Sequence, residues 1–208
     1  MPEALLPLFP LRLVLFPGTP LPLHIFEDRY KEMIGEAIHN QSEFGVVQAG
    51  QKGIANTGCT ATIERVLKRH DDGRLDILTL GRRRFEILLL NEERSFLRGS
   101  VQFYDDDDLS PAPDDLKRKA MEGFAALRAL GETHVFGDPE LEDPRLSFQL
   151  AQLVDDLSFR QSLLALRSEA ERIKQLADYL PTYAARQQYV SHMKSVASSN
   201  GHGKSSHS

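Results

Sequence analysis

The sequence predicts an α+β fold, in which a β-barrel or folded sheet with one inserted helix precedes an α-helical bundle. Over residues 1–104, short segments of alternating apolar and polar residues are separated by turn signals, and one stretch has helical spacing. The composition changes at residues 105–113, which are acidic and rich in proline, and the segments beyond show helical spacing. We therefore expect a β-rich subdomain over 1–104, a linker over 105–113, a helical bundle over 114–195 and a disordered tail over 196–208.

The β-rich half opens with apolar stretches over residues 5–16 and a turn at Phe16-Pro17-Gly18, where proline fixes φ and glycine permits a positive φ. After an extended segment over 21–26, a helix is expected from Glu27 to about His39. Its apolar residues recur at helical spacing, and its acidic first turn suits the helix dipole.

Strands are expected over the rest of this half. Alternation marks residues 59–64, and Asp72-Gly73 predicts a hairpin into 75–80. Two further alternating segments begin at Phe85 and Phe96.

The helical half is expected to contain several amphipathic segments. The spacing predicts helices over 114–130, from Asp143-Pro144 onward, and over 158–166. Ser168 and Glu171 form a capping box before the next helix, and Pro181 is expected to interrupt it before a last helix reaches about Ser195.

Composition and charge exclude several classes of protein. The 208 residues carry a formal net charge of −5, which argues against a nucleic-acid partner. The single cysteine excludes an intrachain disulfide and a multi-cysteine zinc site. The N-terminus lacks a secretory signal and no apolar run approaches a membrane span, so we expect a cytoplasmic protein with no membrane partner.

No catalytic, cofactor or metal site is predicted. Gly203-Lys204-Ser205 lacks the glycine and strand that a phosphate-binding loop needs. Cys59 lies mid-strand and is expected to be buried. The histidines His24, His39, His70 and His134 are scattered along the chain and form no HExxH pattern. The acidic run 105–108 lacks the glycine and distal glutamate of a calcium loop, so it is interpreted as solvated linker.

Several motifs, in order, resemble the N-terminal substrate-binding domain of Lon-type ATP-dependent proteases. They are Leu6 to Gly18 with Pro20 to Tyr30, Gly45-Val46-Val47, Gly58 to Ile63, Gly81-Arg82-Arg83-Arg84-Phe85, Arg160-Gln161-Ser162-Leu163-Leu164 and Glu171-Arg172-Ile173. The resemblance spans about residues 4–181 and implies a PUA-like β-barrel joined to a helical bundle. Arg160 stands where this family usually has lysine, which we expect to be a small change on an exposed helix.

The resemblance also implies what the chain lacks, namely the P-loop ATPase and Ser-Lys protease domains of full-length Lon. We therefore expect a stand-alone, non-catalytic module that is no enzyme. We expect a structural role for the signature residues: Glu27 and Arg29 would pair with strands or cap the helix, Gly81 would permit a bend, and Arg84 would stack or bridge near the barrel rim. The signature residues are Phe16, Pro17, Gly18, Glu27, Arg29, Tyr30, Gly81, Arg84 and Phe85.

Three functions remain open at this point. The leading hypothesis is recognition of unfolded or degron-bearing polypeptides in protein quality control, alongside a protease, at an exposed apolar patch or sheet edge. The first alternative is an RNA-binding PUA-like protein, for which Arg82-Arg83-Arg84 with Lys68-Arg69 is the basic concentration. The second alternative is a protein that binds a small molecule between barrel and bundle; a homo-oligomer is compatible with each.

Overall fold

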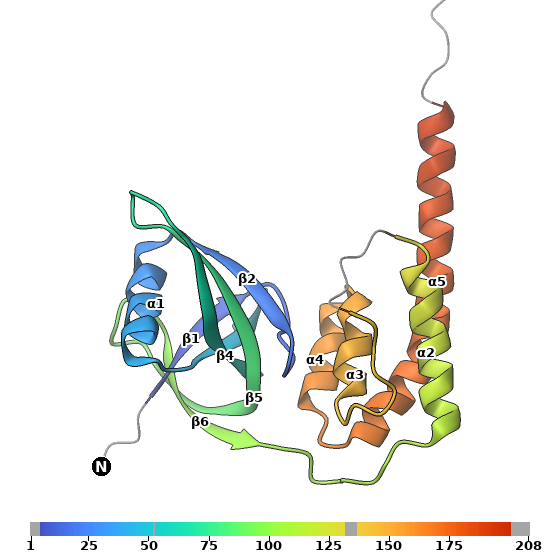
Figure 1. The fold of residues 1–208 in the computed structure, drawn as a ribbon, viewed down its shortest axis with the longest axis horizontal. Helices are drawn as coiled ribbons and strands as arrows, with labels where there is room; N and C mark the ends of the chain where they lie inside the picture. Colours follow the sequence, from blue (N-terminus) through green and yellow to red (C-terminus); the bar gives the residue numbers. More distant parts are fainter. Residues whose placement is uncertain (1–4, 52, 132–136, 201–208) are drawn as a thin grey trace, which may run out of the picture. The chain divides into compact units, whose positions relative to one another are not determined.

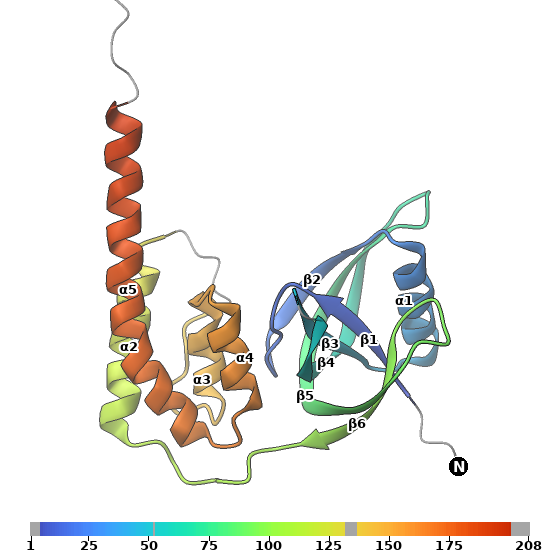
Figure 2. The ribbon, with the colours of Figure 1, turned by 180° about the vertical axis from the view of Figure 1, so that it is seen from behind.

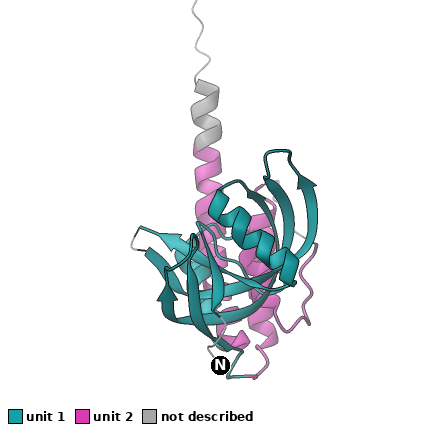
Figure 3. Cartoon of the chain, turned by 90° about the vertical axis from the view of Figure 1, so that its left-hand side faces the viewer, with its two compact units in different colours: residues 1–108, 154–167 teal, residues 109–153, 168–208 magenta. Residues whose placement is uncertain are grey.

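The computed structural model describes residues 5–51, 53–131 and 137–200 and divides the chain into two compact units (Figure 3). Unit 1 comprises Met1–Asp108 and Val154–Arg167, and unit 2 comprises Leu109–Leu153 and Ser168–Ser208. Residues 154–167, which were expected in the helical bundle, group with the β-rich unit, and the expected linker 105–113 is divided between the two units after Asp108. The predicted tail over 196–208 and the Gly203-Lys204-Ser205 motif fall largely or wholly outside the described residues.

Unit 1 contains six strands, the helix α1 that follows the second strand, and a second helix from later in the chain, α4 Leu157–Ala165 (Figure 1). Strands β1, β3, β4, β5 and β6 pair in a ring, which β5 closes by pairing with β6, and β2 pairs with β5. The β1–β3 pair is parallel and all other pairs are antiparallel. The bounds are β1 Leu6–Leu11, β2 Pro20–Ile25, α1 Asp28–Asn40, β3 Phe44–Gly50, β4 Gly53–Arg69, β5 Leu75–Asn91 and β6 Arg98–Tyr104. The predicted α+β class is confirmed.

The predicted turn at Phe16-Pro17-Gly18 forms a type II β-turn. The Thr19 amide donates to the Phe16 carbonyl at 3.2 Å, and Gly18 has φ +75°. Gly81 allows this turn to pack directly against the backbone of β5. It lies inside strand β5, directly before an irregularity in the pairing with β4 where Arg82 and Arg83 lie opposite the single residue Thr60. A Cβ added at Gly81 would meet the Phe16 carbonyl oxygen at 2.1 Å, so the absent side chain lets two backbone segments approach closely.

Apolar side chains are buried on both sides of β1. Leu8 packs with Val47 and Phe85, and its neighbour Phe9 packs against Tyr30 of α1 with tilted rings at a centroid distance of 4.2 Å. Phe16 and Phe44 are also fully buried. The buried face of α1 consists of Tyr30, Met33, Ile34 and Ala37, which is the helical stripe expected from the spacing.

Helix α4, Leu157–Ala165, belongs to unit 1 although it comes from the helical half of the sequence. The Arg160 guanidinium donates to the Val14 carbonyl and the Gln161 amide donates to the Thr57 carbonyl, both at 2.9 Å. Leu163 and Leu164 are fully buried beside them. The expectation that Arg160 lies on an exposed helix was wrong, because this side chain is half-buried and burial lowers its pKa.

The buried Arg84 holds the C-terminal end of α4. Its guanidinium pairs with Asp106 at 2.6 Å and donates to the Leu166 carbonyl at 2.5 Å, while the Tyr104 hydroxyl donates to the Leu164 carbonyl at 3.1 Å. These donors satisfy carbonyls that a helix end leaves without partners. Asp106 is therefore part of a buried network, and the interpretation of 105–108 as solvated linker was wrong at this residue.

Unit 2 consists of α2 Asp114–Arg128, α3 Leu146–Leu150, the 3₁₀ turn η1 Ala151–Leu153 and α5 Glu169–Asn200. Helix α2 packs on α5 at Gly123, where a Cβ would meet the Leu180 Cβ at 2.7 Å. Arg172 of α5 is 1% exposed, pairs with Glu169 at 2.8 Å and donates to the Ser147 hydroxyl at 2.9 Å. A charge buried this deeply needs these partners.

The prediction that Pro181 ends a helix was wrong. Helix α5 runs through Pro181 to Asn200, and Figure 2 shows it as one continuous helix. Proline removes one backbone hydrogen bond from a helix interior, but side chains are buried on both sides of it: Leu176, Ala177 and Leu180 before Pro181, and Tyr183 and Ala184 after it. No helix in the described part of the chain is long and apolar enough to cross a membrane.

Candidate functional site

The largest run of exposed apolar side chains in unit 1 lies at the end of β5. Leu88, Leu89 and Leu90 are 58%, 71% and 44% exposed. The register explains why three consecutive leucines face solvent: Ile87 lies opposite Val101 and Leu89 opposite Ser100, so Leu88 is the extra residue of a β-bulge. A bulge breaks the alternation of a strand and redirects its side chains.

Ile87, which precedes these leucines in the chain, packs against an apolar cluster. Leu8, Val47 and Phe85 form its buried centre. The partly buried side chains packed against this centre are Leu6, Ile54, Ile87, Leu97 and Val101. We call the exposed Leu88, Leu89 and Leu90 the leucine surface. Contiguous apolar surface of this kind is typical of protein–protein contact sites.

An open strand edge lies elsewhere on unit 1. Strand β4 pairs with β3 only up to Ala61, and among the described residues its remaining stretch pairs on one side only, with β5. A groove of about 410 Å³ runs along this edge, lined by residues 62–66 of β4 and by Ala37, Ile38, Gln41 and Ser42 at the end of α1. An extended peptide can pair with such an edge through its main chain.

The arginine triplet does not form a continuous basic patch. Arg84 is buried against Asp106, and Arg83 pairs with Glu43 at 3.0 Å with its guanidinium 3.9 Å from the centre of the Phe103 ring. Arg82 is exposed. Carboxylates therefore pair with two of the five basic residues on which the RNA alternative depends.

Glu27 and Arg29 pair with each other at 2.6 Å, and the Arg29 guanidinium lies 4.7 Å from the centre of the Tyr30 ring. Glu27 occupies the N-cap position of α1 but caps it without a side-chain hydrogen bond. These signature residues therefore organise the start of α1 locally, rather than by pairing with a strand.

Cys59 is fully buried in β4, as expected. Burial raises the pKa of its thiol to about 12, which suppresses the thiolate that a nucleophile needs.

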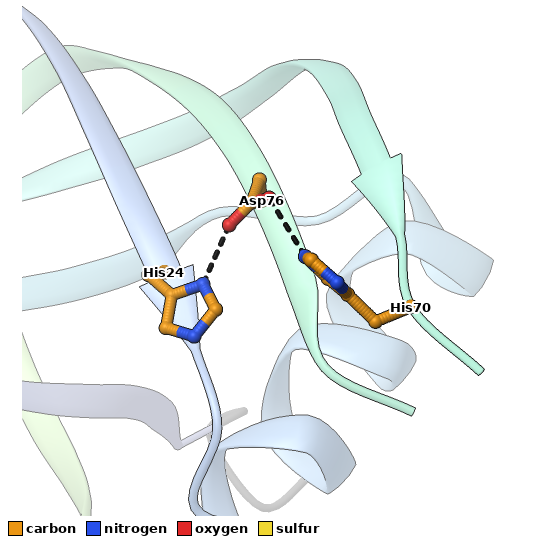
Figure 4. A group of neighbouring side chains, drawn as sticks. All are labelled: His24, His70 and Asp76. Atoms are coloured by element: carbon orange, nitrogen blue, oxygen red, sulfur yellow. Dashed lines mark hydrogen bonds and ion pairs between the residues drawn. The ribbon is translucent and has the colours of Figure 1, made fainter. Parts of the chain in front are cut away.

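Two histidines that lie far apart in the sequence meet at one carboxylate, so the expectation of scattered histidines was wrong for this pair. Figure 4 shows His24 and His70 on either side of Asp76. Nδ1 of His24 lies 2.5 Å from one carboxylate oxygen and Nε2 of His70 lies 2.8 Å from the other. The hydrogen bond with His24, and to a smaller extent the one with His70, lowers the pKa of the Asp76 carboxyl. No local motif signals this cluster, because strand pairing creates it.

The fold is a ring of strands with an inserted helix, followed in the chain by a helical unit. Comparison with known proteins identifies the family that has this fold. The family model of the ATP-dependent protease La (LON) substrate-binding domain matches residues 5–198. The chain belongs to this family, and the resemblance seen in the sequence motifs is confirmed.

Solved structures of this family share the fold. A Lon N-terminal domain protein from Xanthomonas campestris is 25% identical with a TM-score of 0.68, covering 86% of this chain and 100% of its own. The N-terminal domain of the Mycobacterium avium complex Lon protease has a TM-score of 0.61 at 17% identity, covering 85% and 98%.

Relatives of known sequence are much longer than the matched region. The Lon protease of Parabacteroides distasonis is 36% identical over 110 residues, which cover 49% of this chain and 13% of that protein. The Lon protease of Flavobacterium johnsoniae is 24% identical over 193 residues, which cover 84% of this chain and 24% of that protein. The chain thus matches a small fraction of these relatives.

Proposed function

We propose that unit 1 is a non-catalytic module that binds extended, apolar segments of unfolded or degron-bearing polypeptides at the leucine surface. The observation that carries this proposal is the run of three exposed leucines at the end of β5. Membership of a substrate-binding family supports a polypeptide ligand. An adaptor role beside a cytoplasmic protease is the biological setting that we infer from the Lon relatives.

The leucine surface suits segments that are normally buried. Such segments are exposed in unfolded chains and hidden in folded ones, so an apolar surface discriminates between the two states without reading a particular sequence. The bulge also matters, because it places Leu88 and Leu89 in solvent together instead of on opposite faces of the strand.

The experiment compares the affinities of three variants for a fluorescent, permanently unfolded model protein by anisotropy. The variant Leu88→Ser/Leu89→Ser/Leu90→Ser is expected to bind at least about tenfold more weakly, because it loses most of the apolar area of the site. Leu67→Ser and Leu109→Ser remove leucines that are 50% and 85% exposed outside the surface, and they are expected to bind as the wild type does. Equal affinities for all variants would refute the leucine surface as the site.

The oligomeric state is measured on the same samples by light scattering. Two results together would overturn the proposal: the wild type is a dimer whereas the triple variant is a monomer, and the wild type binds the unfolded protein no more tightly than it binds an inert globular control. They would show that a second copy of the chain covers these leucines.

A further inference from the structure

We propose that His24, His70 and Asp76 form a three-ligand site for a divalent transition-metal ion, with Zn²⁺ the ion that best fits the donor set. Two imidazole nitrogens and one carboxylate oxygen converge from three separate segments of unit 1, and these ligand atoms all lie within 4.8 Å of one another. This inference is independent of the leucine surface, which lies at the other end of β5.

Strand pairing brings two of the ligands together. His24 on β2 lies directly opposite Asp76 on β5 in the antiparallel register, so the two side chains share one face of the sheet. The neighbours of Asp76 on β5, Leu75 and Ile77, point inward and are buried, which fixes the outward direction of the carboxylate. Both ligands thus stand on a rigid element.

The β4–β5 hairpin supplies the third ligand. His70 directly follows β4, and its backbone is held on both sides: its amide donates to the Arg74 carbonyl at 2.9 Å, and its carbonyl accepts from the Gly73 amide at 3.0 Å. Gly73 has φ +82°, the conformation that this tight turn requires of a glycine. The imidazole of His70 is thereby directed at Asp76 from the side opposite His24 (Figure 4).

The chemistry and spacing suit a small borderline ion. Zinc binds imidazole nitrogen and carboxylate oxygen at about 2.0–2.2 Å, and three protein ligands leave a fourth position for water or another ligand. In tetrahedral geometry the ligand atoms lie about 3.4 Å apart. Because the three ligand atoms here all lie within 4.8 Å of one another, small rotations of the two histidine rings would bring them to this spacing around an ion. Calcium and magnesium prefer oxygen donors, which argues against them here.

Exposure leaves the site accessible. The side chains of His24, His70 and Asp76 are 45%, 20% and 32% exposed, so an ion can enter without unfolding the sheet. A ring nitrogen that hydrogen-bonds to the ionised Asp76 carboxylate is the donor, and Zn²⁺ would take the place of the proton in that hydrogen bond.

The test is a Zn²⁺ titration of the full chain by calorimetry, in a background with His202→Gln and His207→Gln to remove the histidines near the C-terminus. One Zn²⁺ per chain is expected. The double variant His24→Gln/His70→Gln is expected to weaken binding by at least about tenfold, whereas His39→Gln, which changes an exposed histidine on α1, is expected to leave it unchanged.

A second measurement needs no variant at the site. In the same background, addition of Zn²⁺ is expected to shift the imidazole NMR signals of His24 and His70 and not that of His39, and Co²⁺ is expected to give the absorption bands of a tetrahedral site. A dissociation constant weaker than about 1 mM, shifts confined to other histidines, or equal affinity in the double variant would each overturn the proposal.

Discussion

Replacement of Arg84 by methionine is expected to destabilise unit 1 by about 3 kcal/mol. Methionine keeps an unbranched apolar stem but removes the guanidinium that joins Asp106 to the Leu166 carbonyl. The Arg84 and Asp106 side chains are 6% and 16% exposed, so the change leaves a carboxylate and a carbonyl poorly solvated. Removing one partner of a buried pair costs roughly 3–5 kcal/mol, and the partial exposure of Asp106 places the expected loss at the lower end.

The neighbouring arginines provide matched controls for the same substitution. Arg83→Met breaks an ion pair with Glu43 in which the arginine is 56% exposed, and a loss of about 0.5 kcal/mol is expected. Arg82 is exposed, and Arg82→Met is expected to change stability by less than about 0.5 kcal/mol. Three adjacent residues of one type are thus expected to give three different costs.

The assay combines urea unfolding with hydrogen exchange of peptides from α4. Because Arg84 donates to carbonyls at the end of α4, Arg84→Met is expected to accelerate exchange over 157–165, and the other two variants are not. A loss below about 1 kcal/mol together with unchanged exchange in α4 would refute the role assigned to Arg84.

Three further outcomes are expected. Gly81→Ala should strongly destabilise unit 1 in urea unfolding, because its Cβ would meet the Phe16 carbonyl oxygen at 2.1 Å, whereas Gly35→Ala in α1 meets nothing within 4 Å and should stabilise by about 0.5–1 kcal/mol. Because burial raises the pKa of Cys59 from 9.0 to about 12, the unfolded chain loses this proton first as the pH rises. The free energy of unfolding is therefore expected to fall from pH 9 upward, and the Cys59 thiol contributes as much as about 1.4 kcal/mol per pH unit to this fall. A Cys59→Ala variant that loses stability equally steeply between pH 9 and 10.5 would contradict this role of the thiol. Pro181→Ala should restore a helical hydrogen bond in α5 and raise the stability of unit 2 by about 1 kcal/mol or more. A lower urea midpoint for this variant would contradict the expectation that Pro181 destabilises the helix.

The features predictable from the sequence were those with local causes. The turn at Gly18, the hairpin at Gly73 and the apolar face of α1 each follow from a few neighbouring residues, and all three formed as expected. The docking of α4 was not predictable in this way. Arg160 and Gln161 look like surface residues, yet their long side chains reach backbone carbonyls of unit 1 while their stems are covered.

The sites required knowledge of strand pairing. No sequence motif links His24 with His70, because only the pairing of β2 and β4 with β5 places both rings at Asp76. The exposure of Leu88 likewise depends on a bulge whose position is set by the pairing of β5 with β6. Alternation alone would have placed Leu88 and Leu89 on opposite faces.

The placement of residues 154–167 in unit 1 has a consequence for how the chain acquires its structure during synthesis. All six strands leave the ribosome before α4 does, and residues 109–153 of the other unit come between them. Until residues 160–166 emerge, the carbonyls of Val14 and Thr57 lack the donors Arg160 and Gln161, and Arg84 lacks its acceptor at the Leu166 carbonyl. A fragment cut at the acidic, proline-rich segment would be held permanently in that incomplete state, so the visible boundary in composition is a poor place to divide this protein.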